Sequence, residues 1–62
     1  MKENLKTLRL NRGFSQRQIA TILDISESYY CLIENGERRP SVEVAKRIAA
    51  VLGFDWQKFY EE

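Results

Sequence analysis

Apolar residues recur along the chain at spacings of three and four, the period of amphipathic helices, and polar residues fill the positions between them. Glycines, serines and the single proline interrupt these runs. The pattern predicts five helical segments: residues 3–12, Gln16–Leu23, Glu27–Glu34, a helix after Ser41 that ends before Gly53, and one or two turns after Asp55. Strand-like alternation and internal repeats do not occur, so we expect a single all-α domain over residues 1–62.

Serine residues stand directly before three of the predicted helices. Ser15 and Gln18 have the S-x-x-Q spacing, in which the hydroxyl and the amide satisfy two main-chain N–H groups at the start of a helix. Ser26 is a good N-cap for the third helix, and Ser41 has the same place before the fourth. These residues predict helix starts immediately after positions 15, 26 and 41.

The second and third predicted helices are separated only by Asp24, Ile25 and Ser26. A turn of this length is too short for antiparallel packing, so the two helices must cross steeply, as in a helix-turn-helix. The small side chain of Ala20 lets the third helix approach closely. Ile25, in the turn, can fill the space between the two helices from the core side.

The third predicted helix has two unlike faces. At about 100° per residue, Tyr30 and Ile33 lie together with Ser26, and we assign this side to the core. The other side, here called the outward row, consists of Glu27, Ser28, Cys31, Leu32 and Asn35. A short helix that presents such a row is an element that the major groove of DNA admits.

The stretch FSQRQIATILDISESYYCLIENGERRPS resembles the helix-turn-helix of the lambda-repressor and Cro type, found in many phage and bacterial regulators. The resemblance covers nearly the whole chain and rests on the combined spacing of Arg9, Ser15-Gln16, Ile19-Ala20, Ile33-Glu34-Asn35-Gly36 and Pro40-Ser41. It implies a compact five-helix lambda-repressor-like domain that binds double-stranded DNA sequence-specifically. Relatives commonly bind as dimers, which implies a palindromic operator and a role as a transcriptional regulator, here a repressor of phage or mobile-element type.

The resemblance assigns base contacts to Glu27, Ser28 and Leu32. Glu27 can accept a hydrogen bond from a cytosine amino group, and Leu32 can pack on a thymine methyl group. In the turn, Asp24 stands where relatives usually have Gly. Aspartate tolerates the left-handed conformation less readily than glycine but better than most residues.

Contacts to the DNA backbone are expected from Gln16, Tyr29, Asn35, Arg38 and Arg39. For Gln16 the resemblance implies a phosphate contact, and its place at the positive end of the second helix supports this independently. Asn35 and the basic loop after it match backbone-contacting positions, and the Tyr29 hydroxyl can reach a phosphate. Arg9 and Glu34 match a structural pair that ties the first helix to the end of the third.

Charge is distributed unevenly along the chain. Ten Lys and Arg residues face nine Asp and Glu residues, which gives a formal net charge of +1. The acidic residues concentrate in residues 24–37, and basic segments flank this stretch. Because this electrostatic footprint is weak for a nucleic-acid-binding protein, we expect affinity to depend on a dimer and a few phosphate contacts.

Composition excludes several kinds of site. With no His and with Cys31 alone, the chain cannot build a Cys/His zinc cluster or a His-activated nucleophile, so we expect no metal, no cofactor and no enzymatic activity. Cys31 is expected to be an inert outward thiol. The apolar run Ile48–Leu52 is far shorter than the roughly 18 residues of a membrane span, and the N-terminus lacks a signal-peptide pattern. We therefore expect a cytoplasmic protein.

Three aromatic residues close together near the end are too many to leave exposed on so small a domain. We expect Trp56 to face inward and Phe59 with Tyr60 to lie partly at the two-fold contact of a homodimer. The reason is that two copies of the third helix must lie about 34 Å apart to contact a palindrome.

A different function for the same fold is a protein-interaction module, either antitoxin-like or a repressor partner. It would use Tyr29, Cys31 and Leu32 to bind a protein, and the acidic stretch 24–37 is its best support. The two hypotheses differ in salt dependence, because DNA affinity falls steeply with salt and an apolar protein contact does not.

Overall fold

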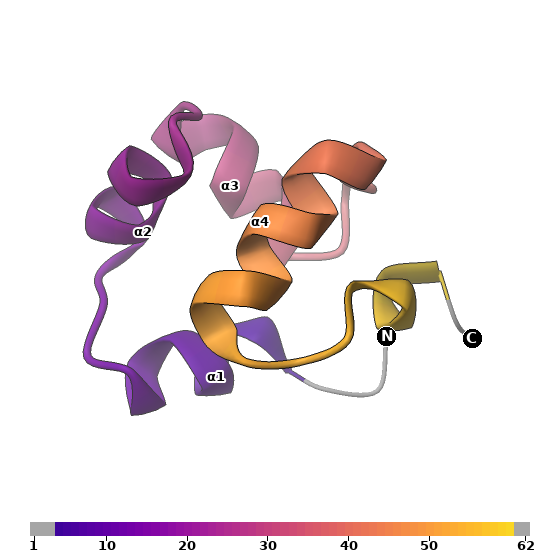
Figure 1. The fold of residues 1–62 in the computed structure, drawn as a ribbon. Coiled ribbons are helices and arrows are strands. Elements are labelled where there is room, and N and C mark those ends of the chain that lie inside the picture. The colour runs from indigo at the N-terminus through magenta and orange to yellow at the C-terminus, as the bar shows by residue number, and fades with distance from the viewer. Residues whose placement is uncertain (1–3, 61–62) are drawn as a thin grey trace.

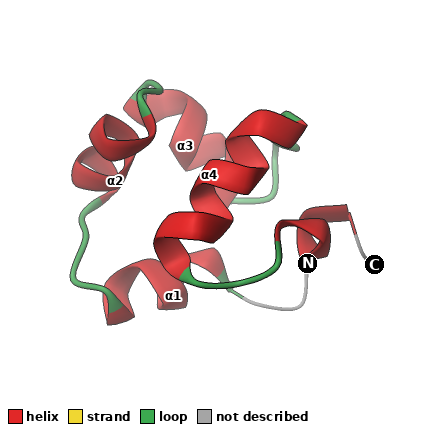
Figure 2. Ribbon diagram, in the orientation of Figure 1, coloured by secondary structure: helices red, strands yellow, loops and turns green. Residues whose placement is uncertain are grey.

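Four α-helices and a closing 3-10 helix form the domain in the computed structural model, which describes residues 4–60 (Figure 1). The elements are α1 (Leu5–Asn11), α2 (Gln16–Leu23), α3 (Glu27–Glu34), α4 (Val42–Leu52) and η1 (Trp56–Tyr60). Short loops join them, and no strand occurs within the described range (Figure 2). The all-α prediction and the bounds of α2 and α3 are confirmed. The first position of the predicted segment 3–12 lies outside the described residues.

The expected fifth helix is corrected to a 3-10 helix. Gly53 ends α4 in the left-handed conformation at φ 78°, and the Asp55 side chain then accepts from the Gln57 main-chain N–H at 3.0 Å. Only the five residues Trp56–Tyr60 follow in helical conformation. A piece this short adopts the tighter 3-10 geometry readily, because it has too few residues to gain from longer-range helical hydrogen bonds.

The predicted serine caps are present. Ser15 Oγ accepts from the Gln18 main-chain N–H at 3.0 Å, and Gln18 Oε1 accepts from the Ser15 main-chain N–H at 2.8 Å, which completes a capping box. Ser26 Oγ accepts from the Tyr29 N–H at 3.0 Å. Ser41 caps α4 in the same way, at 3.3 Å from the Val44 nitrogen. Local sequence therefore sets where three of the helices begin.

The turn between α2 and α3 depends on a left-handed residue. Asp24 has φ 59° and ψ 44°, the one positive φ among the described non-glycine residues. The next N–H, of Ile25, donates to the Ala20 carbonyl at 3.0 Å, and Arg47 from α4 donates to the Leu23 carbonyl at 3.2 Å. These bonds satisfy main-chain carbonyls at the end of α2 and stabilise the turn that sets the angle between α2 and α3.

The core lies where α1, α2, α3 and η1 meet α4, which passes across the front of the domain in Figure 1. Its buried residues are Leu5, Ile19, Ala20, Leu23, Tyr30, Ile33, Ala45, Ile48, Leu52 and Phe59. Tyr30, Ile19 and Ile48 have no exposed surface.

Within residues 4–60, no helix combines the length and apolar character that a membrane crossing needs.

Phe59 was expected to lie partly at the two-fold contact of a homodimer. Its ring belongs to the core, only 9% exposed and 5.5 Å from the Phe54 ring, and so has little free surface for such a contact. Trp56, expected to face inward, is half-buried and lies edge-on to Tyr60 at 6.0 Å. Trp56 nevertheless packs against the core from its edge, as Phe54 and Tyr60 do.

Candidate nucleic-acid interface

The two faces of α3 differ as the sequence predicted. Tyr30 and Ile33 are buried at 0% and 4% exposure. The residues of the outward row Glu27, Ser28, Leu32 and Asn35 are exposed, and Cys31 is half-buried. Leu32 keeps 37% of its surface in solvent although it is apolar. One side of α3 is therefore anchored, and the other is free to meet a partner.

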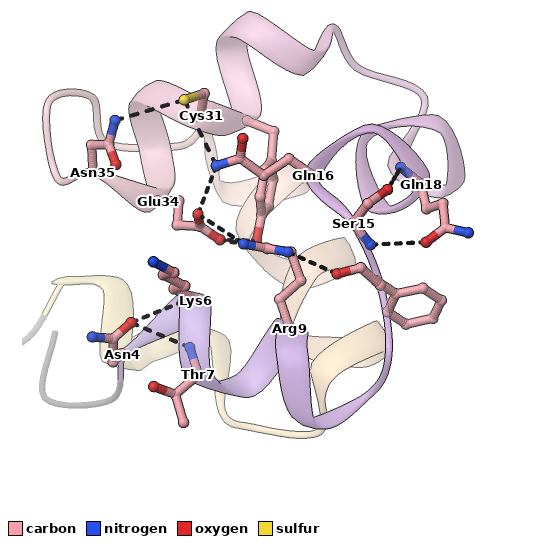
Figure 3. A network of polar contacts seen from close by, with 12 residues as sticks. Asn4, Lys6, Thr7, Arg9, Ser15, Gln16, Gln18, Cys31, Glu34 and Asn35 are labelled. Carbon is pink, nitrogen blue, oxygen red and sulfur yellow. Dashed lines mark hydrogen bonds and ion pairs between the residues drawn. The ribbon is translucent and has the colours of Figure 1, made fainter.

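A polar network centred on Glu34 fixes α3 against α1 and α2 (Figure 3). Arg9 Nε donates to Glu34 Oε1 at 2.8 Å, and the two side chains are only 7% and 4% exposed. Arg9 Nη1 also donates to the Phe14 carbonyl at 2.7 Å. The Tyr30 hydroxyl donates to Glu34 Oε1 at 3.2 Å. The expected structural pair is thus present, with two further partners.

The electrostatics of this network favour its charged form. Burial alone would raise the pKa of Glu34, but hydrogen bonds from Arg9 and then Gln16 outweigh it and leave that pKa lowered. The hydrogen bond with Glu34 raises the pKa of Arg9. Burial, followed by the negative charge of Glu34, raises the pKa of the Tyr30 hydroxyl, which stays protonated and donates. The carboxylate is therefore ionised and compensated at neutral pH.

Gln16 lies at the junction between α2 and α3. Its Nε2 donates to Glu34 Oε2 at 2.7 Å and, at 3.8 Å, to the sulfur of Cys31 (Figure 3). The sequence did not predict these bonds, because nothing in the local pattern brings residues 16 and 34 together. A thiol is a weak acceptor, so the Gln16 N–H that points at Cys31 can instead donate to a stronger acceptor.

An ion pair at the exposed start of the two helices was also missed. Arg17 Nε lies 3.5 Å from Glu27 Oε1, with side chains 85% and 48% exposed. An exposed pair of this kind stabilises the fold little. The pair does place the positive charge of Arg17 beside Glu27, the acidic residue of the outward row. The sequence did contain a sign of this pair, because Arg17 and Glu27 carry opposite charges at the starts of consecutive helices.

Two exposed basic side chains follow α3 in the chain. Here the connector means Glu37–Pro40, the segment between the end of α3 and the Ser41 cap. Asn35 caps α3, and its Nδ2 donates to Cys31 Sγ at 3.6 Å. The Arg38 guanidinium lies 5.5 Å from the centre of the half-buried Tyr29 ring, and Arg39 lies 5.6 Å from that of Tyr60. Both arginines are exposed.

Two helices joined by a tight turn, with the second one anchored on one side and exposed on the other, define a helix-turn-helix domain. The sequence matches the helix-turn-helix family over residues 5–59. The chain therefore belongs to this family of DNA-binding transcriptional regulators.

Curated proteins similar to the chain carry names of the same kind. An uncharacterized HTH-type transcriptional regulator of Bacillus subtilis, YqaF, is 48% identical over 62 residues, covering 100% of this chain and 82% of its own length. Control protein C.MunI of Mycoplasma sp is 34% identical over 94% of this chain and 80% of its own. The HTH-type transcriptional regulator RamB of Mycobacterium tuberculosis is 45% identical over 82% of this chain, which is only 11% of its length. No solved structure matches the chain significantly.

Proposed function

We propose that the protein is a sequence-specific regulator that binds double-stranded DNA by inserting α3 into the major groove, and that it acts as a repressor of phage or mobile-element type. The observation that carries the proposal is the division of α3 into a buried Tyr30 side and an exposed Ser28 and Leu32 side. An eight-residue helix with one free side fits the width of the groove. Residues 1–62 then form one DNA-binding domain without enzymatic activity, acting in the cytoplasm.

Base contacts are assigned to the exposed residues in the outward row. Ser28 can donate to or accept from several bases, and Leu32 can pack on a thymine methyl group. Glu27 can accept from a cytosine amino group, and the nearby Arg17 reduces its repulsion of phosphate.

Contacts to phosphates are assigned to residues on both sides of α3. Gln16 is the first residue of α2, where the helix dipole favours an anion, and its bond to Glu34 holds the amide at that place. Arg38 and Arg39 of the connector are exposed cations, and Asn35 and Tyr29 lie near them in the chain. Such contacts set position and orientation but do not distinguish sequences.

The protein is proposed to act as a homodimer on a palindromic operator. Two α3 helices must contact successive major grooves, about 34 Å apart, for a palindrome to be bound. Tyr60 and Phe59 are the candidates for the contact between the copies, and the half-buried Tyr60 has more free surface for it than Phe59, which is 9% exposed.

Equilibrium binding to a duplex enriched from a random DNA pool tests this function. Gln16→Ala and Arg39→Ala are expected to weaken binding to all duplexes alike, because phosphate contacts carry no sequence information. Ser28→Ala and Leu32→Ala are expected to change the preferred bases, at about 1–3 kcal/mol per lost contact. Unchanged affinity and preference in both of the latter variants would contradict the assignment of the outward row.

A second candidate function is a protein-interaction module, antitoxin-like or a repressor partner. It is favoured by the 37% exposure of Leu32 beside the half-buried Tyr29 and Cys31. Affinity for duplex DNA that falls steeply between low and high salt supports the first proposal, because it reports counterion release. Association with a protein that is insensitive to salt, without DNA binding, supports the second.

A further inference from the structure

The connector is held in place by a side chain from the far end of the chain. The Tyr60 hydroxyl donates to the Pro40 carbonyl at 3.0 Å, across twenty residues of sequence. The Arg39 guanidinium carbon lies 5.6 Å from the centre of the same ring. One side chain of η1 thus contacts both the main chain and a cation of the connector.

Tyr60 is itself well supported. The Trp56 ring lies edge-on to it, with centroids 6.0 Å apart and planes at 80°. The Lys46 ammonium group from α4 lies 5.2 Å from the centre of the Trp56 ring and so covers that ring in turn. The Tyr60 ring therefore has a defined position relative to α4, from which it can orient a flexible neighbour.

The start of the connector is bound to α3, because the Glu37 and Arg38 main-chain N–H groups both donate to the Leu32 carbonyl, at 2.9 and 3.2 Å. Tyr60 contacts its other end, at Arg39 and Pro40. Arg38, Arg39 and Pro40 line a cavity of about 460 Å³, so one side of this segment is not filled by protein. Proline has no main-chain N–H to donate, and an exposed arginine side chain otherwise samples many rotamers. Ordering such a side chain upon binding lowers affinity, and ordering it beforehand avoids that loss.

We propose that Tyr60 is a positioning residue for DNA-backbone binding, which holds the connector and orients the Arg39 guanidinium toward a phosphate. This inference rests on the proposed DNA-binding function. A cation–π contact uses the positive charge of the guanidinium, so the N–H donors of Arg39 are available for phosphate oxygens. The contacts are made within one chain and exist in a monomer and a dimer alike.

A double-mutant cycle between Arg39 and Tyr60 tests the inference, with a labelled mixed-sequence duplex of about 24 base pairs, two helical turns, as the probe. Arg39→Ala is expected to lower the slope of log affinity against log salt by about one for each bound subunit. Tyr60→Leu is expected to weaken binding about two- to fivefold and to lower the slope similarly. Adding Tyr60→Leu to Arg39→Ala is expected to have no further effect, whereas Tyr60→Phe, which keeps the ring, retains most of the affinity.

Phe54→Leu is the matched control for loss of a half-buried ring in the same part of the domain. It is expected to lower the melting temperature, followed by circular dichroism, and to leave the salt slope unchanged. An equal loss of affinity from Tyr60→Leu with and without Arg39 would overturn the inference. So would a loss for Arg39→Ala together with unchanged affinity for Tyr60→Leu. If the unmodified protein shows no salt-dependent binding to the duplex, the proposed function itself fails, and the inference with it.

Discussion

The Glu34 carboxylate receives hydrogen bonds from residues of three helices. Arg9 donates from α1, Gln16 from α2 and Tyr30 from α3. Removal of either partner of a buried ion pair leaves an uncompensated charge and costs about 3–5 kcal/mol. For a domain of this size, whose total stability is on the order of 3–9 kcal/mol, the orientation of α3 depends strongly on this one side chain.

Glu34→Gln is therefore expected to lower the free energy of unfolding by about 3 kcal/mol, measured by urea titration at pH 7. The folded-state pKa of Glu34 is lowered, so its contribution is present above the unfolded-state value of about 4.3 and is lost as the pH falls through the folded-state value. The variant should consequently lose less stability than the unmodified protein between neutral and acidic pH.

Glu43→Gln is the matched control. Glu43 pairs with Arg47 at 2.7 Å, but the Glu43 side chain is 76% exposed and both residues lie in α4. Its replacement is expected to change stability by less than about 0.5 kcal/mol. Equal effects of the two substitutions would contradict the role given to the Glu34 network.

At the scale of the elements, the turn between α2 and α3 depends on Asp24 in a left-handed conformation. Glycine adopts this conformation without steric cost, while a β-branched residue is strongly disfavoured there. Asp24→Gly is expected to raise the free energy of unfolding by about 0.5 kcal/mol, and Asp24→Val to lower it by more than about 1 kcal/mol. Thermal unfolding measures both, and a more stable valine variant would contradict the account of this turn.

What the sequence predicted well was local. Ser15 with Gln18, and Ser26 before Glu27, act through neighbours within one turn of helix, so their spacing was enough to predict the starts of α2 and α3. The division of α3 into two faces followed from helical periodicity in the same way.

What it could not predict depends on packing between distant segments. The bond from Gln16 to Glu34 crosses 18 residues, and neither residue differs locally from an ordinary exposed polar residue. The burial of Phe59 beside Phe54, with Trp56 only half-buried, depends on how η1 packs against α4, which the local pattern does not show. For the same reason the contacts of Tyr60 with the connector were not foreseen.

For the molecule as a whole, a net charge of +1 provides little general attraction to DNA. Specific contacts and two-fold symmetry must then supply most of the affinity. A dimer on a palindrome doubles the phosphate and base contacts without any change in the domain.

Selection of bound duplexes from a random DNA pool, run in parallel with the unmodified protein and with Leu32→Ala, tests the central claim most directly. The account predicts a palindromic sequence with half-sites about 34 Å apart, and a change of preferred base at one position of each half-site in the variant. Enrichment of the same sequence by both proteins, or of no sequence by either, would contradict the claim that the exposed side of α3 contacts the bases.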